Sequence, residues 1–404
     1  MIFILSLCLL FTCTGILPIS AIAVLMLPIV PIVLYYSNNM VIKKYVFWLL
    51  LFFFVSILSV IFYHYESLLD FDFYRRDGNF IVSFSPILIS FWYSRKFNIE
   101  AVFIFALKFF TLINLLIISF DVVSGGVQSI LRLGEGKTIN FLFDANNAAG
   151  GWQSIVIALA FAYWIRERTV TSFLILGFNF FVELLLVSRG SILGVITFML
   201  LYYVSRGDFK KYSKWLFIVL IGFVAITIVC LFIGYPVYIH NFESFQFANF
   251  DSGKEANIFI RLYENWPRGF YAFVHSPIVG IGFGAMNDLP FHFSTSSSLF
   301  AWNAPENYIF DSNHAHHSYL HILGEQGVVG FYIFMMFWYN LYKSISNSSS
   351  TMFVKLYLLS SMVAILIAGF TEHRLTTPSS ILPFTISIAL WQIKMRSEAN
   401  NVKN

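Results

Sequence analysis

The sequence contains few charged residues. Only 11% of its 404 residues are Asp, Glu, Lys or Arg, whereas soluble domains carry about 25%. Hydrophobic residues make up 58% of the chain and aromatic residues 19%. The apolar residues are gathered in runs such as 44–63 and 215–234, each close to the roughly 20 residues that an α-helix needs to cross hydrocarbon. This composition excludes a water-soluble globular protein and predicts an integral membrane protein.

Cysteine is also scarce. Cys8, Cys13 and Cys230 all lie inside apolar runs, where a thiol behaves as a small hydrophobic group. The three residues therefore predict neither a disulfide framework nor a metal site. Residues 1–17 lack the basic segment of a cleaved signal peptide and lead directly into a second apolar run. We expect them to form a retained first helix.

The apolar runs predict an all-α fold, a polytopic transmembrane bundle of about 12 spans. The expected spans are about 1–18, 19–36, 45–63, 80–94, 100–120, 149–165, 169–187, 190–205, 215–235, 318–339, 354–371 and 378–393. They divide the chain into nine helices with short loops (1–235), one large loop between spans 9 and 10 (236–317), and three helices with a short tail (318–404). The large loop contains aromatic and charged residues and no low-complexity sequence, so we expect it to fold and pack on the bundle.

Basic residues predict the orientation of the bundle. With the N-terminus in the cytoplasm, 15 of the 25 basic residues lie in the short inner loops: Lys43, Lys44, Arg95, Lys96, Arg166, Arg168, Arg206, Lys210, Lys211, Lys214, Lys343, Lys355, Lys394, Arg396 and Lys403. Cytoplasmic loops are enriched in Lys and Arg in this way. We therefore expect the long loop, and any site on it, to face the non-cytoplasmic side of the membrane.

Histidines are concentrated where the large loop ends. His314, His316 and His317 close the loop, and His321 follows one helical turn later. A metal site is one interpretation, but no carboxylate, cysteine or H-E-x-x-H pattern completes a ligand set. A proton-transfer role for one imidazole is favoured over a metal site, because neutral histidine accepts a proton near neutral pH. The remaining alternative is that these histidines lie in the loop at the membrane interface and have no functional role.

Three arginines are candidates for binding an anionic ligand. Arg189 lies at the outer end of two consecutive spans, where it is either an interfacial anchor or part of a ligand site. Arg261 and Arg268 lie in the large loop. A guanidinium group binds phosphate oxygens in a bidentate manner, so several on one face would suit a diphosphate. Glu183 and Glu325, carboxylates inside expected spans, are further candidates, although Glu325 could simply pair with a nearby base.

A glycine run and three aromatic residues of the large loop are weaker indications of function. The glycines at 280, 282 and 284 follow no strand, and no Walker sequence occurs, so nucleotide-driven work is unsupported. Trp266, Trp302 and Tyr308 lie in the large loop, where they either belong to an aromatic belt or stack on sugar rings.

The order of these features resembles the O-antigen ligase and polymerase superfamily over residues 140–340. The matching pieces are Ser188-Arg189-Gly190, Arg261 with Trp266, Pro277-x-x-Gly280-x-Gly282-x-Gly284, Ala315-His316-His317-Ser318-Tyr319-Leu320 and Glu325-x-Gly327-x-x-Gly330. Two positions depart from the family pattern. The residue after the family histidine is usually Asn, Ser or Gln and here is His317, and Trp266 stands one place further from Arg261, which leaves Arg268 a rival second arginine.

The resemblance implies a metal-independent membrane glycosyltransferase of the GT-C type that needs no cofactor. Its implied location is the bacterial inner membrane, with the site facing the periplasm. The implied partners are an undecaprenyl diphosphate-linked glycan donor, a glycan acceptor and membrane lipids, with a chain-length-regulating membrane protein as a further candidate and no nucleic acid.

Carried over by residue, the resemblance makes His316 the catalytic base and Arg189 with Arg261 or Arg268 the diphosphate binders, supported by His317, Tyr319 and Glu325.

Four functions remain open at this stage. The segment 369–372 and the tenth span favour a polymerase, which joins lipid-linked repeat units, over a ligase, which moves the finished chain onto lipid A-core. A transporter or flippase would also have 12 spans, but it would place ionisable residues near the bilayer centre, where the sequence has only Lys108. A membrane receptor or structural protein is the last alternative. Convergence of His316, Arg189 and Arg261 on one cavity would favour the enzyme.

Overall fold

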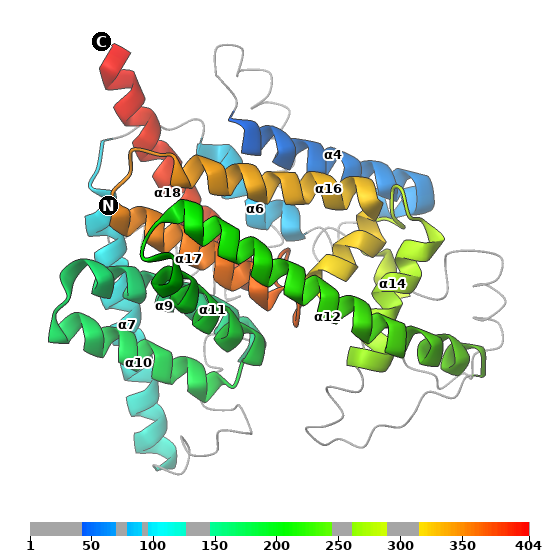
Figure 1. Ribbon diagram of the computed structural model, residues 1–404, viewed down its shortest axis with the longest axis horizontal. Helices are drawn as coiled ribbons and strands as arrows, with labels where there is room; N and C mark the ends of the chain where they lie inside the picture. Colours follow the sequence, from blue (N-terminus) through cyan, green and yellow to red (C-terminus); the bar gives the residue numbers. More distant parts are fainter. Residues whose placement is uncertain are drawn as a thin grey trace.

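The computed structural model describes residues 43–69, 79–90, 96–126, 146–244, 261–288 and 315–403, and every regular element in these ranges is helical (Figure 1). The elements are α4 (Lys44–His64), η1 (Tyr65–Leu69), α6 (Asn79–Ile89), α7 (Ile99–Gly125), α9 (Asn146–Glu167), α10 (Val170–Leu186), α11 (Arg189–Ser205), α12 (Phe209–Ser244), η4 (Arg261–Asn265), α14 (Trp266–His275), η5 (Ala285–Asp288), α16 (Ser318–Ser346), α17 (Met352–Ala368) and α18 (Pro378–Lys403).

Ten of the expected spans coincide with helices in the described residues, and the first two, within 1–36, lie outside them. Four of these helices are long and apolar enough to cross a membrane: Lys44–Tyr63, Ile99–Gly125, Phe209–Ile239 and Ser318–Ser346. Val170–Leu186, Arg189–Ser205 and Met352–Ala368 are apolar but shorter. α12 continues to Ser244, nine residues beyond the expected end of its span, so the large loop begins later than position 236.

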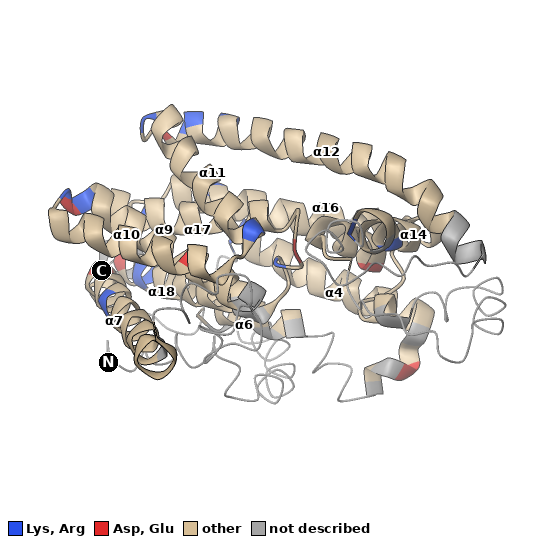
Figure 2. Ribbon diagram, turned by 90° about the horizontal axis from the view of Figure 1, so that it is seen from below, with Lys and Arg blue, Asp and Glu red and all other residues tan. Residues whose placement is uncertain are grey.

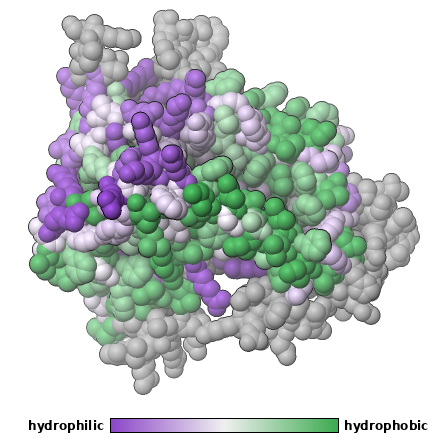
Figure 3. Space-filling view, viewed as in Figure 1, coloured by the Kyte–Doolittle hydropathy of each residue, from purple (hydrophilic) through white to green (hydrophobic). Residues whose placement is uncertain are grey.

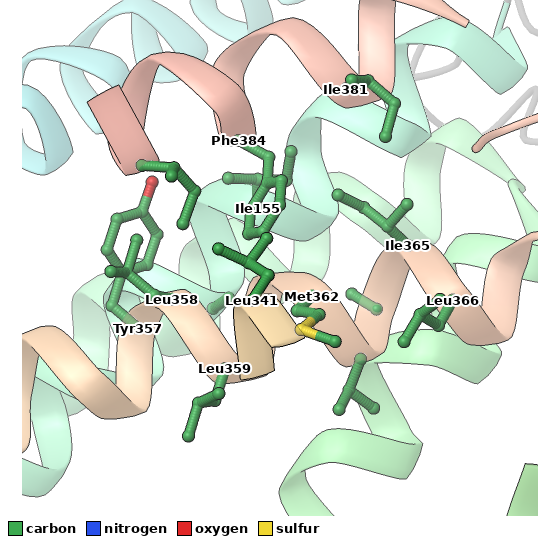
Figure 4. Close-up of a cluster of buried hydrophobic side chains, with 14 of the residues drawn as sticks. Ile155, Leu341, Tyr357, Leu358, Leu359, Met362, Ile365, Leu366, Ile381 and Phe384 are labelled. Atoms are coloured by element: carbon green, nitrogen blue, oxygen red, sulfur yellow. The ribbon is translucent and has the colours of Figure 1, made fainter. Parts of the chain in front are cut away.

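Helix α17 forms the centre of the bundle. Every residue from Phe353 to Ala368 is buried except Lys355, as expected for a helix surrounded by others rather than by lipid. It packs against α9, α11, α16 and α18. Figure 4 shows Ile155, Leu341 and Phe384, from α9, α16 and α18, meeting the buried side chains of α17. The core around α17 is therefore largely apolar.

The helix ends that the basic residues assign to the cytoplasm lie together at one end of the bundle. Arg166 at the end of α9 pairs with Glu100 at the start of α7. The hydroxyl of Tyr342, late in α16, donates to the carbonyl of Phe209, the first residue of α12, at 2.8 Å. Lys43 lies 4.9 Å from the ring centroid of Trp391, which is midway along α18 and near the end of the expected span 378–393. The starts of α11 and α16 and the end of α17 consequently lie at the opposite end.

Helix α12 presents an apolar surface along most of its length. Phe217, Ile221 and Phe232 are 65%, 52% and 84% exposed, and Figure 2 shows its charged positions gathered at one end. In Figure 3 the surface over α12 is largely apolar, and hydrophilic residues gather near its start. This distribution fits a helix that faces lipid hydrocarbon.

Helix α16 is not the continuous span that the sequence predicts. Gly327 has φ 64°, ψ −173° and interrupts it. Backbone groups released by the break bond to residues 277–282: Val328 and Val329 donate to Pro277 and Ile278, and Ile281 and Gly282 donate to Gly324 and Glu325. The segment after α14 is thus wedged into the break, and the freed groups are satisfied.

Candidate functional site

The loop between α17 and α18, residues 369–377, connects the parts of the candidate site, and we name it the hub loop. Ser318, the first residue of α16, holds it in place. The Ser318 hydroxyl donates to the Glu372 carbonyl at 2.8 Å and accepts from the amides of Arg374 and Leu375 at 2.7 and 3.1 Å. The amide of Ser318 donates to the carbonyl of Gly369 at 2.8 Å. The hub loop is therefore fixed to the residues that immediately follow His316 and His317.

Glu372 brings two of the predicted site residues together. One carboxylate oxygen accepts from Arg261 Nη2 at 2.8 Å, and the other lies 3.8 Å from His316 Nδ1. The side chain of Glu372 is 8% exposed, whereas those of Arg261 and His316 are 26% and 36% exposed. A buried carboxylate thus stands behind a guanidinium and an imidazole that both reach the surface.

Electrostatics keep Glu372 ionised. Burial alone would raise the pKa of its carboxyl, but the neighbouring His316 and the charges of Arg261 and Arg374 outweigh burial and hold this pKa below its ordinary value. The carboxylate can therefore orient His316 and stabilise a proton on that imidazole.

Arg189 lies beside this group. It is the first residue of α11 and is exposed. The next residue, Gly190, is packed so closely on the hub loop that a Cβ there would lie 2.3 Å from Thr371 Oγ1 and 3.3 Å from Glu372 Cγ. No side chain caps the start of α11, so its free N–H groups and positive dipole end also lie at the site.

His316 has an unusual backbone conformation. Its φ is +44°, in the left-handed region that residues other than glycine rarely adopt. Such strain costs about 1–3 kcal/mol and is often found at functional sites. Here the turn directs Nδ1, which is buried, toward Glu372 and leaves other parts of the imidazole accessible.

His317 has a structural role in the described residues. It is 1% exposed, and its Nδ1 accepts from the amide of Leu320, so it caps α16. Nε2 therefore carries the proton and donates to Thr227 Oγ1 at 3.1 Å. Burial lowers the pKa of His317 to about 3. A permanently neutral imidazole without access to solvent supports the site by its position and takes no part in proton transfer.

The two candidate arginines in the large loop differ in exposure. Arg261 reaches the site, but Arg268, on α14, is 0% exposed. The structure therefore brings Arg261 to Glu372. Tyr319 is also buried: its hydroxyl donates to the Leu366 carbonyl at 2.8 Å, and its ring packs on Phe370. It joins α16 to α17 beneath the site.

Glu325 pairs with a nearby base, one of the alternatives left open above. One oxygen lies 3.2 Å from His321 Nε2, and the other accepts from the Gly284 amide at 2.9 Å. The His321 ring in turn contacts that of His373, with ring centroids 4.1 Å apart. The glycine run is explained by the same packing, because a Cβ at Gly280 would lie 2.2 Å from the Glu325 carbonyl oxygen.

Sequence reasoning missed Glu372 and Arg374 as site residues. The available signal was the run Glu372-His373-Arg374, three ionisable residues at the outer end of an apolar span, where charges are expensive without partners. Several sequence candidates, namely His314, Trp302 and Tyr308, lie outside the described residues. Within the described ranges, no group of three or more His, Cys, Asp or Glu could hold a metal ion.

These features define a helical membrane protein with a cationic site, backed by a buried carboxylate, at one end of its bundle. Residues 174–335 match the family model described as O-antigen ligase, which confirms the resemblance to the O-antigen ligase and polymerase superfamily. The matched region contains Arg189, Arg261 and His316, whereas the hub loop lies beyond it. Comparison with the curated proteins gave no match.

Proposed function

We propose that the protein is a glycosyltransferase that polymerises lipid-linked oligosaccharide repeat units into a surface polysaccharide. The observation that carries the proposal is the convergence of Arg261 and His316 on Glu372, 2.8 and 3.8 Å from its two oxygens, with Arg189 on the adjoining helix start. This arrangement combines an oriented base with cations for a diphosphate. The family description supports a glycan substrate linked to a membrane lipid.

In the proposed mechanism, His316 accepts the proton of an acceptor hydroxyl, and the hydroxyl oxygen attacks the anomeric carbon of the donor sugar. A new glycosidic C–O bond forms while the bond from that carbon to the diphosphate oxygen breaks. The electron pair of the broken bond leaves with the lipid diphosphate, whose growing charge is stabilised by Arg189, Arg261 and the start of α11. Glu372 stabilises the imidazolium produced.

The setting of the site suits a substrate with a long lipid tail. The site lies at the end of the bundle opposite the basic helix ends, and by the positive-inside rule this end faces the periplasm. A bacterial inner membrane and an undecaprenyl diphosphate carrier belong to the same proposal. The activated diphosphate linkage supplies the driving force, so no nucleotide is required.

Transfer of a finished polysaccharide to lipid A-core is the second candidate. The description of the matching family model names a ligase, and the site geometry serves either acceptor.

A complementation experiment tests both functions. In a strain that lacks the gene, we expect wild-type protein to restore the surface polysaccharide and His316→Ala and Arg261→Ala to fail, at equal membrane abundance. His275→Gln, at the end of α14, where Nδ1 lies 3.2 Å from the Tyr271 carbonyl oxygen, is the matched control and should restore it. Single repeats on core in the deletion strain indicate a polymerase, whereas polymer that accumulates on the carrier lipid indicates a ligase. Full activity of His316→Ala would contradict the mechanism.

A further inference from the structure

Glu183 is a buried carboxylate that the mechanism above does not use. It lies in α10, is 0% exposed, and neither of its side-chain oxygens has a hydrogen-bond partner in the described part of the chain. An isolated carboxylate in such a place is expensive to bury unless an opposite charge compensates it. The compensating charge is Arg374 of the hub loop, which is also buried at 2% exposure.

Two consecutive glycines on α9 make room for this pair. A Cβ at Gly150 would lie 3.1 Å from Glu183 Oε1 and 2.5 Å from Ser188 Oγ, and a Cβ at Gly151 would lie 2.7 Å from Arg374 Nη1. Arg374 Nη2 donates to the same Ser188 hydroxyl at 3.3 Å. The carboxylate and the guanidinium thus approach one small space beside Ser188, immediately before Arg189.

Arg374 faces a second carboxylate as well. Its charge interacts with both Glu372 and Glu183, and its terminal nitrogens donate to Ser188 Oγ at 3.3 Å and to Ser380 Oγ at 3.4 Å. Glu183, Arg374, Glu372 and Arg261 therefore form a row of alternating charge. The row runs from inside the bundle to the exposed edge of the site.

We propose that Glu183 is a positioning residue of the transfer reaction, which acts through Arg374 to keep Glu372 available to His316 and Arg261. This inference rests on the proposed function. Without the charge of Glu183, the buried guanidinium of Arg374 would be compensated by Glu372 alone. Glu372 would then be drawn from Arg261 and His316, and the imidazole would accept a proton less readily.

The charges around the His316–Glu372 pair determine the sign of the expected effect. They are Arg261 from η4, Arg374 from the hub loop, Arg189 from α11 and Glu183 from α10. Removing the negative charge of Glu183 leaves Arg374 to draw on Glu372 alone, so less of the Glu372 charge is available to stabilise a proton on His316. The acidic limb of the pH–rate profile should therefore move to lower pH.

The experiment measures the pH–rate profile of transfer from a lipid diphosphate-linked glycan, with the full chain in lipid nanodiscs. For Glu183→Gln we expect turnover to fall roughly tenfold and the acidic limb to move down by about one pH unit. Glu183→Asp, which keeps the charge, should retain the wild-type limb. Asn179→Ala, which removes another buried polar side chain of α10, is the matched control and should lower thermal stability without moving the limb.

A double variant tests the route of the effect. In an Arg374→Gln background the charge through which Glu183 acts is absent, so adding Glu183→Gln should move the limb no further. The double variant buries no uncompensated charge, so we expect it to fold even if Glu183→Gln alone does not. A further shift in that background would overturn the inference, as would an unchanged limb for a folded Glu183→Gln.

The inference and the proposed function fail in different ways. If His316→Ala is as active as the wild-type protein, the function falls and the role of Glu183 falls with it. If His316→Ala is inactive and Glu183→Gln keeps the wild-type profile, only the role of Glu183 is overturned.

Discussion

The side-chain hydroxyl of Ser318 donates a 2.8 Å hydrogen bond to the backbone carbonyl of Glu372. This bond joins the start of α16 to the hub loop across 54 residues of sequence. Because His316 lies two residues before Ser318, the same bond sets the distance between the proposed base and the carboxylate behind it. The separation between His316 and Glu372 therefore depends on how the start of α16 is attached to the hub loop.

Ser318→Ala should weaken both the fold and the site. The amides of Arg374 and Leu375, which now donate to Ser318 Oγ, would lose their acceptor inside the protein. A buried donor without a partner costs about 1–3 kcal/mol. We expect a lower thermal unfolding temperature in detergent and reduced polysaccharide in cells. Ser346→Ala, at the exposed far end of α16, is the control, and an equal loss in both variants would contradict this role for Ser318.

His317→Asn should make the protein less sensitive to acid. The pKa of His317 is about 3 in the fold and about 6.5 in an unfolded chain. As pH falls through this interval, the unfolded chain binds a proton that the folded protein does not bind, so stability declines. Between pH 7 and 5 this amounts to about 2 kcal/mol for a fully buried histidine.

Asn is a residue that the superfamily commonly carries at this position, and its side-chain oxygen can still cap α16. Thermal unfolding of both proteins at pH 7, 6 and 5 checks the prediction. Parallel declines for the wild-type protein and His317→Asn would show that acid sensitivity arises elsewhere.

Gly280→Ala should be strongly destabilising. Gly280 has φ +76°, and its added methyl group would lie 2.2 Å from the carbonyl oxygen of Glu325 and 2.4 Å from the amide nitrogen of Gln326. Both atoms belong to the backbone and cannot rotate out of the way as a side chain could. The segment 277–282, which packs into the break of α16, would therefore be displaced. The strained φ alone costs about 1–2 kcal/mol.

Gly177→Ala in α10 is the matched control, because nothing lies within 4 Å of its added carbon. Alanine favours a helix by about 1 kcal/mol over glycine, so this variant should be as stable as the wild-type protein or more so. Comparable protein yields and unfolding temperatures for the two variants would contradict the tight packing of segment 277–282 into the break of α16.

Hydrophobic runs predict most of the helices because each run is long enough to specify one element without tertiary information. α4, α7 and α10 begin or end within a few residues of their expected bounds. The break at Gly327 was not predicted, since the local sequence remains apolar and only the docked segment 277–282 stabilises the freed backbone groups. The local sequence pattern therefore predicts where helices form, but it does not predict which distant segments pack against them.

The candidate site was predicted in part. The histidine and arginine candidates were identified from residue types and order, and the structure brings His316 and Arg261 to a common carboxylate. That carboxylate was missed. The charged run 372–374 indicates that these residues need partners, but it does not indicate that a loop 56 positions after His316 folds back beside it. Arg268 could not be separated from Arg261 by sequence, because burial, which distinguishes them, depends on the packing of α14.

Three consecutive residues of the hub loop contact different neighbours. Glu372 reaches Arg261 and His316, His373 contacts His321, and Arg374 bonds to Ser188. Deleting or inserting one residue between positions 371 and 374 would present these neighbours with the wrong functional groups. A deletion, for example, would place an imidazole where a carboxylate belongs and a guanidinium where an imidazole belongs. Small changes in the length of this loop should therefore be far more damaging than most exchanges of its individual amino acids.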